Sequence, residues 1–181
     1  MIRSYILLLR GINVSGKNII KMDQLKKMMI DLGFNNCRTY IQSGNVLFES
    51  NESDRLKLID LIQNQIEIIF NLKVKLQVLL PEELEKALAE NPFLKQEELD
   101  VKQHYFAFLD EVPTSDALNN LLNWELNGEL MAYAPKVLFV YYSNGAGQSK
   151  LTTNFIESKL KVGATMRNLN TTQKLISLAN S

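Results

Sequence analysis

The stretch RTYIQSGNVLFE, residues 38–49, decides the fold class because it indicates two strands joined by a tight turn. Gly44-Asn45, between two runs rich in aliphatic and aromatic residues, is typical of a type II′ β-hairpin. In that register Ile41 lies opposite Phe48, and the two side chains share an apolar face. Because a tight hairpin is antiparallel, the sheet that contains it is predicted to be mainly antiparallel.

The segments on either side of the hairpin predict an ordered series of helices and strands. Their expected ranges are a strand at 3–10, a helix at 23–32, a helix at 53–70 and a strand at 75–80. Asp23 is expected to cap the first helix and Gly33 to end it. The first strand contains YILLL, which is apolar on both faces, so we expect it at the centre of its sheet. The order strand-helix-strand-strand-helix-strand is the ferredoxin-like plan.

The second half of the chain repeats this order less clearly. A helix is expected from residue 81, and the later elements are expected at 104–109, 115–123, 129–133, 136–142, from about 149, at 164–167 and at 170–179. We therefore predict an α+β protein with two related, tightly packed, ferredoxin-like halves and mainly antiparallel sheets. The halves are residues 1–80 and 81–181, which a diverged internal duplication would explain.

Composition narrows the class of protein. Hydrophobic residues make up 46% of the 181 residues and charged residues 22%, as in globular proteins with a substantial core. No apolar run approaches the roughly 18–20 residues of a membrane span, and no signal-cleavage pattern is recognised. With one Cys and one His, the chain offers neither an intramolecular disulfide nor a four-ligand zinc site. We expect a cytoplasmic protein without metal, cofactor or membrane contact; its oligomeric state is left open.

The net charge of zero conceals a segregation along the chain. Residues 1–50 carry seven Lys/Arg against three Asp/Glu, residues 51–130 carry seven against sixteen, and residues 131–181 carry six against one. One interpretation is that the acidic middle consists of solvated helix faces, such as 81–90. The other is that the two basic ends come together and form one cationic surface.

The segment GINVSGKN, residues 11–18, resembles a nucleotide-binding P-loop up to its last position. A P-loop requires Ser or Thr where this chain has Asn18, because that hydroxyl binds magnesium. Its helix must also begin at the Gly-Lys pair, whereas here residues 19–22 intervene. The antiparallel hairpin contradicts the parallel sheet of such proteins. The sequence therefore predicts that the protein is not a P-loop NTPase.

Several segments resemble one known family. They are YILLLRGINVSGKN (5–18), Lys21-Met22, Gly33-Phe34, RTYIQSGNVLFES (38–50), NPF (91–93), SKL (149–151) and ATMRNLNTTQKL (164–175). Together they are similar to the DUF1697 family, which usually has Trp where this chain has Leu169. The resemblance implies an α+β fold with related halves, mostly in bacterial cytosolic proteins, and it implies no established reaction.

Polar and basic residues in the loops predict an anion site. The candidates are Arg10, Asn13, Lys17, Asn18, Lys21, Ser43, Asn45, Lys150, Arg167, Asn168, Asn170 and Thr171. Asn170 and Gln173 have the spacing of a capping box, and Ser149 or Thr152 is expected to begin the preceding helix. Two helix N-termini with Lys150 and Arg167 beside them would attract an anion. The alternative is that these are turn and cap residues with cations that merely cover the surface.

Three hypotheses about function remain. The first is a non-catalytic binding module for a phosphate-bearing ligand, a nucleotide or RNA, at a basic cleft between the halves. The second is an enzyme for a phosphorylated or carboxylated small molecule, with Arg10, Lys17 and Arg167 as an anion clamp. The third is a structural or partner-binding protein. No clear base or nucleophile is present, since His104 and Cys37 are both expected to be structural, and this counts against the second hypothesis. The first hypothesis is favoured because of the charge segregation.

Overall fold

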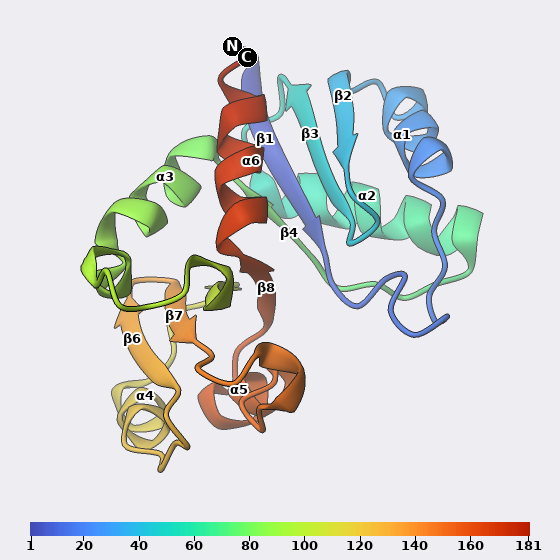
Figure 1. The fold of residues 1–181 in the computed structure, drawn as a ribbon. Helices are drawn as coiled ribbons and strands as arrows, with labels where there is room; N and C mark the ends of the chain where they lie inside the picture. Colours follow the sequence, from blue (N-terminus) through green and yellow to red (C-terminus); the bar gives the residue numbers. More distant parts are fainter. The chain divides into compact units, whose positions relative to one another are not determined.

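Two four-stranded antiparallel sheets and six α-helices make up the fold, as Figure 1 shows for the computed structural model, which describes residues 1–181. This arrangement confirms the predicted α+β class. Contacts divide the chain into a first unit, residues 1–84 with 175–181, and a second unit, residues 85–174. The last residues thus group with the first unit, whereas the sequence-based division assigned them to the second half. No α-helix combines the length and the apolar character that a membrane span requires.

The first unit contains one sheet with the strand order β2-β3-β1-β4. Its elements are β1 (Arg3–Leu9), α1 (Met22–Asp31), β2 (Asn35–Tyr40), β3 (Asn45–Ser50), α2 (Arg55–Phe70) and β4 (Leu76–Leu79). Two further helices each contain residues of both units, because the divisions after residue 84 and before residue 175 fall within them. They are α3 (Pro81–Glu90) and α6 (Leu169–Ala179).

The core of the first unit explains the central place of β1. Tyr5, Leu7 and Leu9 alternate along the strand and belong to one buried cluster with residues of α1 and α2. Ile6 and Leu8, which point to the opposite face of the sheet, are also fully buried. A strand that is buried on both faces is expected inside a sheet, and β1 indeed pairs with β3 on one side and β4 on the other.

The hairpin between β2 and β3 has a different register from the predicted one. Thr39 pairs with Val46 and Tyr40 with Asn45, so the turn comprises the four residues 41–44 and Ile41 lies outside the strands. The prediction placed Asn45 in the turn, but Asn45 is the first residue of β3. Its side-chain amide donates to the Tyr40 carbonyl at 2.9 Å and to Ser43 Oγ at 3.0 Å, which holds the longer turn closed.

The first helix begins one residue earlier than predicted. Lys21 occupies the N-cap position of α1, and its side chain makes no capping hydrogen bond. Asp23, the predicted cap, lies within the first turn, where its Oδ1 accepts from the Gln24 N–H at 2.9 Å. Gly33 follows the helix with a φ of +87°, in agreement with its predicted role as a stop.

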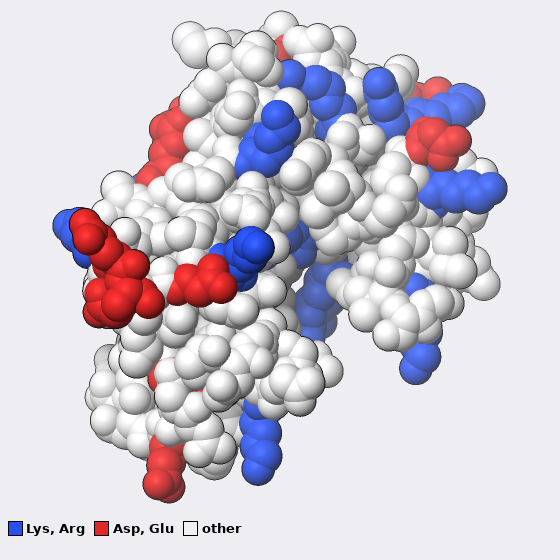
Figure 2. Space-filling view, in the orientation of Figure 1, with Lys and Arg blue, Asp and Glu red and all other residues white.

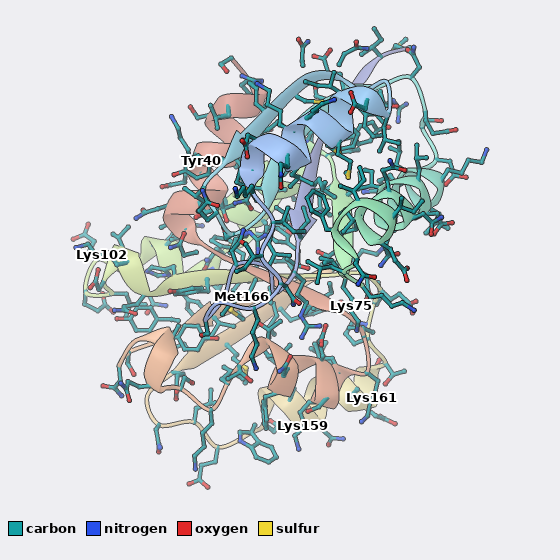
Figure 3. The ribbon with its side chains drawn as sticks, turned by 90° about the vertical axis from the view of Figure 1, so that its right-hand side faces the viewer. Tyr40, Lys75, Lys102, Lys159, Lys161 and Met166 are labelled. Carbon is teal, nitrogen blue, oxygen red and sulfur yellow. The ribbon has the colours of Figure 1, made fainter.

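The second unit repeats the topology of the first, with the strand order β6-β7-β5-β8. Its elements are β5 (His104–Leu109), α4 (Ser115–Leu122), β6 (Leu130–Ala134), β7 (Val137–Tyr141), α5 (Thr153–Leu160) and β8 (Ala164–Asn168). Residues of α4 and α5 pack with one face of this sheet in a separate core. On its surface the Trp124 ring contacts Phe155 edge-on, and Lys159 Nζ (labelled in Figure 3) lies 3.9 Å from the Trp124 ring centre.

Candidate anion-binding site

Three loops of the first unit meet at one end of its sheet. The loop 10–21 follows β1, the turn 41–44 joins β2 to β3, and residues 71–75 lead into β4. Because neighbouring strands are antiparallel, the end of β1 lies beside the starts of β3 and β4. Figure 1 shows the first of these loops projecting beyond the strand ends. We call this region the cationic end, because of the charges that it carries.

Backbone hydrogen bonds join the three loops. The Leu9 N–H donates to the Gly44 carbonyl at 2.8 Å, and the Arg10 N–H donates to the Lys75 carbonyl at 2.9 Å. Gly44 has a φ of +80°, and a Cβ atom there would lie 2.6 Å from Ile12 Cδ1. Only glycine allows this approach of the turn to the loop after β1. The relative positions of the loops are therefore determined by the backbone.

Asn13 and Asn18 stabilise the loop after β1. Asn13 Nδ2 donates to the carbonyls of Ile20 at 2.9 Å and Gln42 at 2.8 Å, while its Oδ1 accepts from the Ile20 N–H at 2.9 Å. Asn18 Nδ2 donates to the Gly11 carbonyl at 2.9 Å. Both amide hydrogens of Asn13 are thus used within the protein. The two asparagines thus hold the loop in place, and their direct contact with an anion remains a prediction.

The tip of this loop is a tight turn that displays Lys17. The Lys17 N–H donates to the Val14 carbonyl at 2.9 Å, and the two residues between them, Ser15 and Gly16, have φ values of +50° and +74°. Two successive positive φ values are typical of a type I′ turn. The turn places the Lys17 side chain in solvent on a backbone that is held by the asparagines.

The cationic end has no acidic residue in its own segments. None occurs in residues 1–22, 32–48 or 68–80, while the cations there include Arg10, Lys17, Lys21 and Lys75. Lys17, Lys21 and Lys75 are exposed and form no ion pair. On the face drawn in Figure 2, only basic and uncharged side chains are visible over this end of the first unit. Lys75, labelled in Figure 3, immediately precedes β4.

The first turn of α1 adds to the positive potential of this end. Its N-cap residue, Lys21, provides no capping side chain, so the N–H groups of Met22 and Asp23 remain available to an acceptor, while that of Gln24 donates to Asp23. Two acidic groups lie close to these segments along the chain: Asp23, in the first turn of α1, accepts from the Gln24 N–H, and Glu67 lies 3.5 Å from Nζ of Lys73 in the loop 71–75. The cations that stay without an acidic partner are therefore Lys17, Lys21 and Lys75, and Lys73 is excluded from this set.

Exposed aliphatic side chains lie between these cations. Val14 is 58% exposed, Ile19 65% and Ile41 47%. Ile41 also has a φ of +49°, which is rare for a β-branched residue and costs about 1–2 kcal/mol. Gly or Asn would adopt this backbone conformation with less strain. The isoleucine keeps about half of its surface exposed, so burial compensates only in part for this backbone conformation.

The predicted residues of α6 in the second unit have structural roles. Asn168 caps the helix: its Oδ1 accepts from the Thr171 N–H at 2.9 Å, and the Thr172 hydroxyl donates to the Asn168 carbonyl at 3.0 Å. The helix begins at Leu169, so the predicted capping box at Asn170 is wrong. Asn168 was recognised as polar and close to the helix start, but the cap was placed two residues too late.

Arg167 is buried rather than displayed to solvent. It lies in β8 opposite Phe106, is 8% exposed, and its Nη1 donates to the Met166 carbonyl at 2.9 Å. Burial lowers the pKa of its guanidinium to about 10, so it remains charged at neutral pH. The prediction of an anion clamp with Arg167 at the surface is not supported by this position within a strand.

The loop before α5 is hydrogen-bonded to an acidic residue that precedes β6. Ser149 Oγ donates to Glu129 Oε1 at 2.6 Å, and this hydrogen bond lowers the pKa of Glu129. The helix begins at Thr153 with Thr152 as its cap, the second of the two predicted starts. Lys150 is exposed but lies next to this Ser149–Glu129 pair in the sequence. Among the candidates, those of the first unit are thus the ones that the structure brings together, and a single cleft that joins both groups remains a prediction.

The sequence and the fold were compared with known proteins. A family profile described as "Protein of unknown function (DUF1697)" matches residues 2–139. The chain belongs to the DUF1697 family. The match includes the cationic end, whereas segments 149–151 and 164–175 lie outside it. A solved structure titled as the conserved bacterial protein SP0830 from Streptococcus pneumoniae has 24% sequence identity to the chain, with a TM-score of 0.78 over 99% of each chain. No curated protein matches.

Two features of this DUF1697 protein were missed by sequence reasoning. Lys75 joins the cationic end because β4 pairs with β1, and only the pairing of distant strands reveals this. Ile41 was placed in a strand because β-branched residues favour strands. The weaker candidates have buried side chains: His104 is 2% exposed and Cys37 6%, and burial lowers the pKa of the former and raises that of the latter.

Proposed function

We propose that this DUF1697 protein is a non-catalytic binding module for a phosphate-bearing ligand, which binds at the cationic end of the first unit. One observation supports the proposal above all others. Three loops without an acidic residue are joined by backbone and asparagine hydrogen bonds, and they display Lys17, Lys21 and Lys75 without any ion pair. Exposed cations that serve only solubility are commonly interspersed with acids.

The chemistry of the site favours phosphate as the bound group. Lysine ammonium groups and free helix N–H groups are the usual partners of phosphate oxygens, and their attraction is charge-assisted. The type I′ turn and the Asn13 hydrogen bonds hold the loop before any ligand arrives, which reduces the entropy lost on binding. A loop that is held in this way is expected to bind its ligand without a large change of backbone conformation.

Binding is favoured over catalysis because of the residue types at this end. The loops 10–21, 41–44 and 71–75 contain no His, Cys, Asp or Glu. A general base or a protein nucleophile is usually one of these residues, although Lys, Ser and Tyr also occur in such roles. The lysines here are exposed, whereas catalytic lysines are usually desolvated to lower their pKa.

The order of elements also supports a ferredoxin-like interpretation of each unit. Both units have the order strand-helix-strand-strand-helix-strand, and in both the first strand lies between the third and the fourth. We infer that the two units arose by duplication of one such module. Only the first has retained or acquired a long cationic loop after its first strand.

Titration with ATP and with pyrophosphate tests the proposed function. Lys17→Ala and Lys75→Ala should each weaken binding about 3- to 10-fold, because each removes one charge-assisted contact. Arg3→Ala is the matched control, since it removes one exposed charge at the opposite end of β1. Isothermal calorimetry at low and moderate salt measures the affinities, and thermal melts check the fold. Equal affinities for all three variants would show that the cationic end is not the site.

A further inference from the structure

We infer that the ligand of the cationic end is a single strand of RNA rather than a free nucleotide, an inference that rests on the proposed function. Three observations lead to it: the cations come from the end of β1, the loop after it and the start of β4, exposed aliphatic side chains lie among them, and one of these aliphatic residues has a strained backbone. Each observation concerns the first unit alone.

The spread of the cations exceeds the size of one phosphate group. Arg10 and Lys75 lie on neighbouring strands, which are about 4.8 Å apart. Lys17 lies farther out, at the tip of the loop that follows β1. A single phosphate reaches only part of this surface. The successive phosphates of a polynucleotide can occupy all of it, as in the electrostatic grooves of single-strand binding proteins.

The aliphatic side chains distinguish a single strand from a duplex. Val14, Ile19 and Ile41 are 58%, 65% and 47% exposed. A duplex presents phosphates outside and stacks its bases inside, so it would leave these side chains in water. A single strand can place unstacked bases on them while its phosphates reach the lysines. The Tyr40 ring, half-buried at the end of β2, is a further surface for stacking.

An anionic membrane is the main competing partner, because it also combines phosphates with apolar material. Segments that insert into membranes usually carry Trp, Phe or Leu on their apolar side. The exposed apolar residues at the three loops are instead Val and Ile. The three loops contain no Trp or Phe, the aromatic anchors of such segments, so the contact with nucleic-acid bases is favoured.

Fluorescence anisotropy with a labelled 12-nucleotide oligouridylate tests the inference. The wild-type protein should bind it at 50 mM salt, and log affinity should fall with log salt with a slope of about −3, as expected for four phosphate contacts to a single strand. Unlabelled oligouridylate should displace the probe at a concentration at least 10-fold lower than ATP. Vesicles with 30% phosphatidylserine should bind no more protein than neutral vesicles.

Substitution of the strained residue provides the decisive variant. Ile41→Asn should weaken oligouridylate binding about 3- to 10-fold and leave the binding of pyrophosphate, which has no base, unchanged, while the melting temperature stays equal or rises because Asn tolerates the positive φ. The control is Ile68→Asn, which alters a 75% exposed aliphatic residue on α2. A purely structural role for Ile41 would change stability without changing affinity for RNA.

The outcomes separate the two proposals. If the protein binds ATP as tightly as oligouridylate, or binds anionic vesicles instead, the cationic end takes a phosphate ligand but the inference of RNA is wrong. The same conclusion follows if Ile41→Asn and Ile68→Asn bind oligouridylate equally. If the wild-type protein binds none of the four ligands (ATP, pyrophosphate, RNA or vesicles) at low salt, the proposed function itself is wrong.

Discussion

The two units share one topology, but they differ at the same end of their sheets. In the first unit, Leu9 donates to the turn carbonyl of Gly44 and Arg10 to the carbonyl of Lys75. In the second unit, Leu109 donates to the carbonyl of Lys136 at 2.9 Å and Asp110 to that of Gly163 at 3.0 Å. The backbone pattern is therefore the same, while an arginine in one unit corresponds to an aspartate in the other.

In the second unit, Asp110 forms hydrogen bonds with other residues at the same end of the sheet. Asp110 Oδ1 accepts from the Gly163 N–H at 2.7 Å, and Lys136 Nζ donates to the Asp110 carbonyl at 3.1 Å. Only residues 110–114 separate β5 from α4, against residues 10–21 in the first unit. In the second unit this end of the sheet is short and hydrogen-bonded within itself, whereas in the first unit it is long and includes lysines without an ion pair. This difference supports the proposal that the ligand binds to the first unit.

The largest effect is expected from a substitution at the first unit's turn. Gly44→Val should lower the free energy of unfolding by about 2–4 kcal/mol, because the side chain would collide with Ile12 and Leu9 and φ is positive. Lys136→Gly, at the corresponding place in the second unit, should change it by less than about 1 kcal/mol. Urea unfolding followed by circular dichroism measures both. If the free energy of unfolding fell by similar amounts in both variants, Gly44 and Lys136 would not occupy equivalent positions in the two units.

An intermediate effect is expected where the charges differ. Asp110→Ala should cost about 1 kcal/mol, since the Gly163 N–H loses its acceptor. Lys75→Ala should cost less than about 0.5 kcal/mol, because that side chain is exposed and has no ion pair. The same urea experiment compares them. If Lys75→Ala proves the more destabilising, then the cationic end serves the fold rather than a ligand.

A smaller effect is expected in the pH dependence of the free energy of unfolding, which should depend on a residue of the second unit. His104 is the only histidine, and burial lowers its pKa, with a weaker opposing influence from Asp100. The unfolded chain, whose histidine pKa is about 6.5, then takes up a proton before the folded state does, so stability falls as the pH decreases below about 6.5. His104→Gln should lose less stability than wild type between pH 7.5 and 5.5. Unfolding monitored by Trp124 fluorescence at several pH values checks this, and identical pH profiles would refute it.

No effect at all is expected in an assay of nucleotide hydrolysis. Clean protein should not hydrolyse ATP or GTP with magnesium, because Asn18 replaces the metal-binding hydroxyl and its amide is bonded to the Gly11 carbonyl. The helix also begins only at Met22, after the loop has closed. Phosphate release that disappears in Lys17→Ala would show that the loop has the catalytic role rejected here.

The sequence predicted the elements well because their signals are local. The strand 104–109 coincides with β5, and the central position of β1 followed from its apolar run. The turn 41–44 was mistaken for a two-residue turn because Gly44-Asn45 is the commoner signal and a positive φ is not expected of Ile41. Propensity is a statistical preference, and here the tertiary hydrogen bonds of the turn overrode it.

The site was predicted only in part, for a different reason. Arg10, Lys17 and Lys21 were recognised because they lie together in one loop. Lys75 was not, since its proximity depends on the pairing of β1 with β4. Arg167 was assumed to be exposed because arginine usually is, but its strand position buries it. Long-range pairing and burial are properties of the whole fold, and a single sequence contains little direct information about them.

The buried thiol of Cys37 gives the chain a natural reporter of opening in the first unit. It is the only cysteine, is 6% exposed, and belongs to the core beneath β1. A thiol reagent can modify it only after that core opens, so the rate of labelling reports the equilibrium between closed and open forms. Trp124, the only tryptophan, lies in the second unit and reports independently by fluorescence. Labelling and fluorescence on the unmodified chain can therefore show whether the two units unfold together or one after the other.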